Sequence, residues 1–160
     1  METDFDLSRY MGLWNEIARL PSPFEQGCVG ATALYTLQED GTVEVRNTCL
    51  GDAPREVVGR AYVPDPDEPF KLVVEFPESP VPGDYWILAL DMSNYQWAVV
   101  GGPSGEFLWI LARAETLPLE LLGQLVQGAA DLGYPVDQLE WSPAQSMLIA
   151  SATEGGSGTG

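Results

Sequence analysis

The sequence contains no histidine and almost no lysine among its 160 residues. Without histidine, neither Ser-His-Asp nor Cys-His catalytic triads can form, and the usual zinc sites lose their imidazole ligands. An axially ligated haem is disfavoured for the same reason. We therefore predict a protein that is not an enzyme and has no metal and no cofactor.

Positive charge is also scarce. Lys71 and six arginines face twenty-four carboxylates, which gives a net charge of −17. Binding to nucleic acid requires a cationic surface, and so does docking on anionic membranes, so the composition argues against both. The charge is typical of a soluble, self-repelling surface, of adaptation to high salt, or of engineering for solubility.

Long hydrophobic runs are missing. No segment approaches the roughly 18 consecutive apolar residues of a membrane-spanning helix, and the acidic start Met1-Glu2-Thr3-Asp4 does not resemble a signal peptide. We expect either a cytoplasmic protein or one whose native leader has been removed. No direct membrane insertion is expected, and the protein is expected to be a monomer or a weak dimer.

Cysteine occurs only twice, at Cys28 and Cys49. One pair lacks the four ligands of a structural zinc site. A disulfide between the two would fit an extracytoplasmic compartment such as the periplasm or the outer membrane. The alternative is two separate, small, buried thiols.

What the sequence does contain is a series of short apolar runs separated by Pro, Gly and Asp-Gly turns, as in Asp40-Gly41. Eight strands are predicted, and their regular hairpin spacing favours an all-β, antiparallel, up-and-down barrel. They are residues 13–19, 30–37, 42–49, 55–63, 70–76, 84–91, 96–101 and 106–113.

One α-helix is expected after the strands, capped by Thr116, with Pro118 in its first turn and an end at Gly133. We place it on the outside of the barrel. Residues 139–141 are a candidate edge strand. Residues 1–150 are predicted to form one domain, and residues 151–160 a flexible Gly/Ser/Thr tail that resembles an expression linker.

Two segments suggest how the barrel is closed. Gly12-Leu13-Trp14 begins the first strand, and Arg113 ends the last. A cation–π contact between Trp14 and Arg113 would close one end as a structural plug. These segments, together with Ala89-Leu90-Asp91 and Tyr95, resemble the lipocalin family, and within it the bacterial branch related to apolipoprotein D.

The resemblance implies an eight-stranded calyx, closed at one end and open at the other, with a pocket for a small hydrophobic ligand. Members of this branch are associated with fatty acids and lysophospholipids and are anchored to the bacterial outer membrane. The sequence departs from the family pattern at Asn15, where bacterial relatives usually have an aromatic residue, and in a longer loop between Asp91 and Tyr95.

Strand alternation predicts the residues that face the cavity, with Trp14 taken as inward. The predicted ligand-binding residues are Glu16, Ala18, Ala31, Ala33, Tyr35, Val45, Asn47, Gly59, Ala61, Leu72, Val74, Phe76, Trp86 and Leu88. The many small residues among them favour a cavity over a filled core.

Two of these residues carry alternatives. Glu16 is a ligand anchor, a structural carboxylate hydrogen-bonded to Asn47 or Tyr35, or an outward-facing side chain. Trp86 either stacks on a flat ligand or is an ordinary packed side chain of the barrel wall. Arg19 is interpreted as a surface charge or as a partner for an anionic head group.

The predicted function is non-catalytic binding and carriage of a small hydrophobic molecule. One alternative is an engineered lipocalin that binds a flat aromatic dye or fluorogen against Trp86. A second is partner binding through the open-end loops, including residues 20–27. Catalysis by Glu16 with Tyr35 is the weakest alternative, because these are the only inward acid/base pair that alternation supplies.

Overall fold

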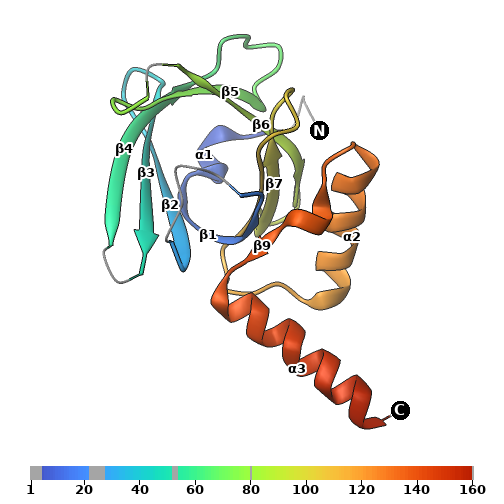
Figure 1. The fold of residues 1–160 in the computed structure, drawn as a ribbon. Coiled ribbons are helices and arrows are strands. Elements are labelled where there is room, and N and C mark those ends of the chain that lie inside the picture. Colours follow the sequence, from blue (N-terminus) through green and yellow to red (C-terminus); the bar gives the residue numbers. More distant parts are fainter. Residues whose placement is uncertain (1–4, 22–27, 52–53, 80, 160) are drawn as a thin grey trace.

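A computed structural model of the chain describes residues 5–21, 28–51, 54–79 and 81–159, with side chains up to residue 152. It contains eight antiparallel strands in sequence order around a closed barrel, as Figure 1 shows. Their bounds are β1 Gly12–Arg19, β2 Gly30–Leu37, β3 Val43–Leu50, β4 Arg55–Tyr62, β5 Lys71–Glu75, β6 Gly83–Leu90, β7 Trp97–Gly101 and β8 Leu108–Ala112. The predicted barrel and all eight predicted strands are confirmed.

Strand β1 closes the barrel because it pairs with both β2 and β8. Gly12 lies opposite Tyr35 at the start of β1, and Arg19 lies opposite Trp109 at its end. Gly12 marks the end of the barrel that the sequence predicted to be closed. Arg19 marks the opposite end, which we call the open end. The short helix α1 (Leu7–Tyr10) precedes β1 and is capped by Asp6, whose Oδ1 accepts a hydrogen bond from the Ser8 amide at 3.0 Å.

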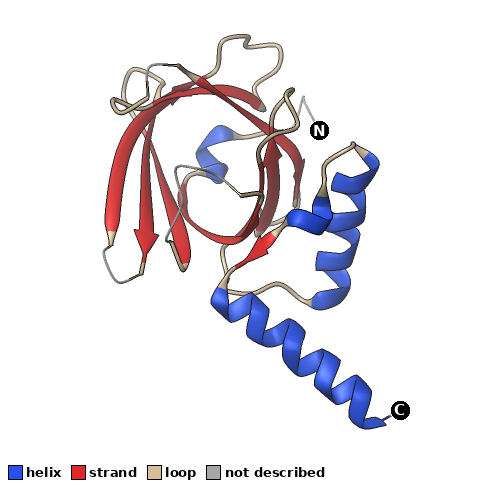
Figure 2. Ribbon diagram, in the orientation of Figure 1, coloured by secondary structure: helices blue, strands red, loops and turns tan. Residues whose placement is uncertain are grey.

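The inner face and one stretch of the outer face of the barrel form separate hydrophobic cores. Helix α2 (Leu119–Asp131) packs Leu122, Leu125 and Ala129 against the outer core, and Figure 2 shows it outside the barrel beside β7. Strands under this helix are apolar on both faces, as buried strands are. The helix begins after Pro118 with no side-chain cap, so the predicted cap by Thr116 is wrong. The predicted end holds, since Gly133 adopts a left-handed φ of 99°.

The C-terminal part consists of a short strand and a helix. Strand β9 (Glu140–Trp141) pairs with the end of β1, where the candidate edge strand was placed. Helix α3 (Pro143–Thr159) follows and extends away from the barrel (Figure 1), where the sequence predicted a flexible tail from residue 151. Ser142 caps this helix through the Gln145 amide, and Pro143 occupies the first helical position. That Ser-Pro start was the signal for a helix that sequence reasoning missed.

Candidate functional site

The barrel interior contains most of the side chains that the sequence predicted. Directly opposed residues share a face, and each of the pairs Ala33↔Asn47, Tyr35↔Val45 and Ala61↔Val74 includes at least one member of the inner core. The same registers place Ala31, Gly59 and Leu72 on the inner face. Phe76 packs against the inner core, and its ring occupies the space beside Gly59 where a Cβ would stand.

Three predicted cavity residues face outward instead. A β-bulge at Ile17 shifts the alternation of β1, so Ala18 lies opposite Ile110 in the outer core. On β6 the inward residue opposite Leu72 is Tyr85, which leaves Leu88 packed against the outer core. Trp86 lies opposite Lys71, whose Nζ stands 4.3 Å from the Trp86 ring.

The closed end is built around Trp14, which is fully buried, and Arg113. The guanidinium lies 3.8 Å from the Trp14 ring centroid, so the predicted stacking is present. Arg113 also donates hydrogen bonds to the carbonyls of Arg9, Leu13 and Tyr95 at 3.0, 3.0 and 3.1 Å. Gly12 has a left-handed φ of 102°, and a Cβ there would stand 3.2 Å from Arg113 Nη1, so the Gly-x-Trp pattern has a steric cause.

Three tyrosine hydroxyls meet in the interior above this plug. The Tyr85 hydroxyl lies 2.7 Å from that of Tyr10 and 2.8 Å from that of Tyr35. Burial raises the pKa of all three hydroxyls above the usual value, so the tyrosines stay neutral. Alternation could not reveal this triad, because Tyr10 belongs to α1 and Tyr85 has the opposite parity to that predicted for β6.

A small cavity adjoins the triad. The cavity has a volume of about 10 Å³, which is about the volume that one water molecule requires. Apart from the three hydroxyls its wall is apolar. It is lined by Leu7, Tyr10, Met11, Tyr35, Val43, Val45, Ala61, Leu72, Val74 and Tyr85.

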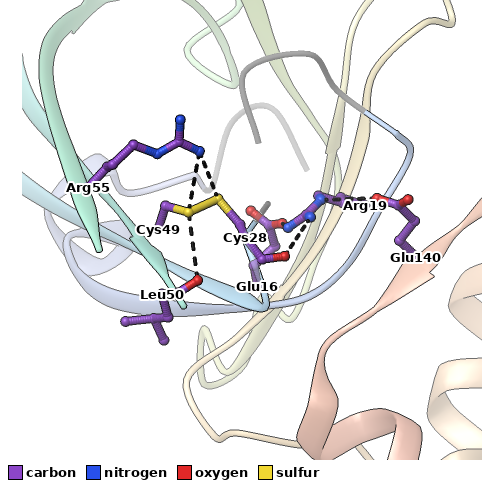
Figure 3. A network of polar contacts seen from close by, with 7 residues as sticks. All are labelled: Glu16, Arg19, Cys28, Cys49, Leu50, Arg55 and Glu140. Carbon is purple, nitrogen blue, oxygen red and sulfur yellow. Dashed lines mark hydrogen bonds and ion pairs between the residues drawn. A yellow bond between two sulfur atoms is a disulfide. The ribbon is translucent and has the colours of Figure 1, made fainter. Parts of the chain in front are cut away.

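Toward the open end, Glu16 forms an ion pair with Arg19, a partner that the sequence analysis did not name for it. Glu16 Oε1 lies 3.1 Å from Arg19 Nη1, and the side chains are 13% and 12% exposed. The bulge at Ile17 turns Arg19 inward, so its interpretation as a surface charge is wrong. Glu140 of β9 contacts the same guanidinium at 3.4 Å, as Figure 3 shows.

A disulfide joins Cys28 to Cys49 beside these ion pairs. Arg55 Nη2 lies 3.6 Å from each sulfur (Figure 3). Residues 22–27, which include most of the loop predicted to bind partners, lie outside the described residues. In the part of the chain that the structure describes, no group of three or more His, Cys, Asp or Glu side chains is arranged to hold a metal ion. Among the same residues, no helix is both long and apolar enough to cross a membrane.

A closed eight-stranded barrel with an apolar inner face, a plugged end and a helix on its outer wall defines a small-molecule-binding β-barrel protein. Comparison with known proteins agrees. Residues 5–144 match the family model of the lipocalin-like domain. The chain is 41% identical over 157 residues to temperature-induced lipocalin-1 of Arabidopsis thaliana, covering 92% of this chain and 84% of the relative. The chain belongs to the lipocalin family.

Two further relatives lie in the branch that the motifs indicated. The outer membrane lipoprotein Blc of Vibrio cholerae is 34% identical, with 86% of this chain and 81% of the relative covered. Mouse apolipoprotein D is 34% identical, with 87% and 77% covered. The lipocalin family is known for binding small hydrophobic ligands, and these relatives are binding proteins rather than enzymes.

Solved structures support the fold. Insecticyanin from the tobacco hornworm Manduca sexta superposes with a TM-score of 0.70 at 23% identity, covering 87% of this chain and 80% of that protein. Lobster apocrustacyanin A1 superposes with a TM-score of 0.66 at 16% identity, covering 84% and 77%. At these identities the likeness concerns the fold alone.

Proposed function

We propose that the protein binds one ligand of the fatty-acid or lysophospholipid class in the barrel interior and carries it outside the cytoplasm. The observation that carries this proposal is the inner face itself. Its wall is largely apolar, and Ala31 and Ala33 present only methyl groups to the interior. The set Glu16, Ala31, Ala33, Tyr35, Val45, Asn47, Gly59, Ala61, Leu72, Val74 and Phe76 remains the proposed ligand wall.

The open end supports an amphipathic ligand. Arg19 and Arg55 both lie there, in a chain whose net charge is −17. A carboxylate or phosphate head group at this end would meet the Arg55 guanidinium while its chain enters the barrel, and Arg19 there is already paired with Glu16 and Glu140. The disulfide and the relatives named outer membrane lipoproteins support an extracytoplasmic location.

The dye-binding alternative has no support in the geometry. It rested on Trp86 as an aromatic wall, and Trp86 stacks with Lys71 on the outer face. Catalysis by Glu16 with Tyr35 is not proposed either, because Glu16 is held by Arg19.

Titration with dansyl-labelled undecanoic acid tests the proposal. Each buried methylene contributes about 0.8 kcal/mol, so about ten contribute about 8 kcal/mol before association costs, which makes about 1 μM the tightest dissociation constant expected from burial of the chain alone. We expect one saturable site from which palmitic acid or lysophosphatidylcholine displaces the probe. Ala31→Trp fills the inner face near the open end and is expected to weaken binding at least about tenfold.

Thr36→Trp is the matched control, because Thr36 follows the inward Tyr35 on β2 and is exposed on the outer face. It should bind the probe as the wild type does. Absence of saturable binding to the wild-type protein, or equal loss of affinity in both variants, would contradict the proposal.

A further inference from the structure

The tyrosine triad holds one more proton than its own hydrogen bonds use. Three hydroxyls carry three protons, and the two contacts among them use two, whichever atom donates in each. If Tyr10 and Tyr35 both donate to Tyr85, the Tyr85 proton is left over. If Tyr85 donates to one neighbour, that neighbour's proton is left over. No other hydrogen bond of these hydroxyls is found among the described residues.

The surplus donor faces a place where water is scarce. Tyr10 and Tyr35 are 2% and 6% exposed, Tyr85 is half-buried, and all three tyrosines line the interior cavity. The side chains of the rest of that wall are Leu, Met, Val and Ala, which offer no oxygen or nitrogen acceptor and only the weak one of the Met11 sulfur. A buried hydroxyl proton without an acceptor is costly, so the site favours whatever brings one oxygen lone pair to it.

The charge of that acceptor follows from the same wall. No arginine or lysine is among the residues that line the cavity. Arg113 lies in the plug against Trp14, where backbone carbonyls hold it, and Arg19 and Arg55 lie at the open end. An ionised carboxylate moved to the triad would lose its hydration with no cation lining the cavity to contact it, whereas a neutral carbonyl would gain a hydrogen bond and keep its apolar chain buried.

We infer that the Tyr10–Tyr35–Tyr85 triad is a recognition site for an uncharged oxygen acceptor, such as a ketone, aldehyde or ester carbonyl, at the end of the ligand that enters the barrel first. This inference rests on the proposed function and narrows it. When a fatty acid enters with its methyl end first, only a water molecule can accept a hydrogen bond from the surplus hydroxyl. A chain that is oxygenated at its buried end satisfies the proton directly.

Displacement of N-phenylnaphthylamine by two ligands of equal chain length, methyl nonyl ketone and undecane, tests the inference. The comparison is made between the wild type and the triple variant Tyr10→Phe/Tyr35→Phe/Tyr85→Phe. The apparent dissociation constant of undecane divided by that of the ketone is expected to be about fivefold to tenfold larger in the wild type than in the triple variant. This factor corresponds to the free energy of one buried hydrogen bond. Comparing ratios cancels the different solubilities of the two ligands.

Tyr62→Phe is the control, since Tyr62 is adjacent to the inward Ala61 and lies on the outer face of β4. It should keep the wild-type ratio. A second readout needs no variant: the infrared carbonyl stretch of bound ketone should lie below its frequency in hexane, because an accepted hydrogen bond weakens the C=O bond.

The outcomes separate the two proposals. If N-phenylnaphthylamine and dansyl-labelled undecanoic acid both fail to bind the wild type, the proposed function fails. If the reporter binds but the triple variant keeps the wild-type ratio, or the carbonyl stretch equals that in hexane, the triad inference alone is overturned. Removing hydroxyls that bond only to one another leaves the side-chain volume almost unchanged, and reporter binding by the triple variant confirms that it is folded.

Discussion

Trp14→Ala is expected to lower the free energy of unfolding by about 3–5 kcal/mol, the usual cost of truncating a large buried aromatic side chain. Trp14 is 0% exposed, donates from Nε1 to the Tyr10 carbonyl at 2.8 Å and packs 4.9 Å from the Tyr10 ring. The substitution removes the packing beneath the tyrosine triad and one face of the Arg113 stack. Urea unfolding followed by circular dichroism measures the change.

Arg113→Ala is expected to cost about 2–4 kcal/mol, because it leaves partly buried carbonyls without their donor. The double variant should lose about 1–2 kcal/mol less than the sum of the single variants, since each single change already removes the stacking. Arg60→Ala is the control, because Arg60 lies 6.0 Å from the Tyr62 ring and is more than half exposed. A decrease in the free energy of unfolding below about 1 kcal/mol for Trp14→Ala would be typical of a surface substitution. It would contradict a structural role for the Trp14–Arg113 plug.

Removing the disulfide is expected to have the second-largest effect. The bond joins residues 21 positions apart, and closing a loop of that size stabilises a protein by about 3 kcal/mol through the entropy of the unfolded chain. The variant Cys28→Ser/Cys49→Ser should therefore unfold at lower urea concentration than the wild type in oxidising buffer.

Reducing agent provides the control for that experiment. It should lower the wild-type midpoint toward that of the double variant and leave the variant unchanged, because the variant has no bond to reduce. A wild type that unfolds identically with and without reductant would contradict a stabilising disulfide.

The strands were predictable because the chain marks its turns with Pro, Gly and Asp-Gly. Faces were predictable on β2 to β5, where pairing runs without a register shift, so Ala33, Tyr35 and Val45 alternate as expected. These strands supply most of the proposed ligand wall.

The errors arise where alternation carries less information. A bulge at Ile17 reverses the faces of Ala18 and Arg19, and no residue pattern announces it. On β6 both parities are apolar, because Leu88 is covered from outside by the core under α2 while Tyr85 and Ile87 fill the inside. The tyrosine triad also includes Tyr10 of α1. The packing of Tyr10 into the barrel depends on tertiary structure, so strand alternation cannot predict it.

Quenching of tryptophan fluorescence by dibromostearic acid tests most directly whether the ligand occupies the barrel interior. Bromine quenches only at close contact. Trp109 faces inward opposite Arg19 and Val100, and Trp86 lies on the outer wall. We predict saturable quenching that Trp109→Phe largely removes and that Trp86→Phe leaves intact. Quenching that survives Trp109→Phe and disappears with Trp86→Phe would place the ligand on the outer surface and contradict binding in the barrel.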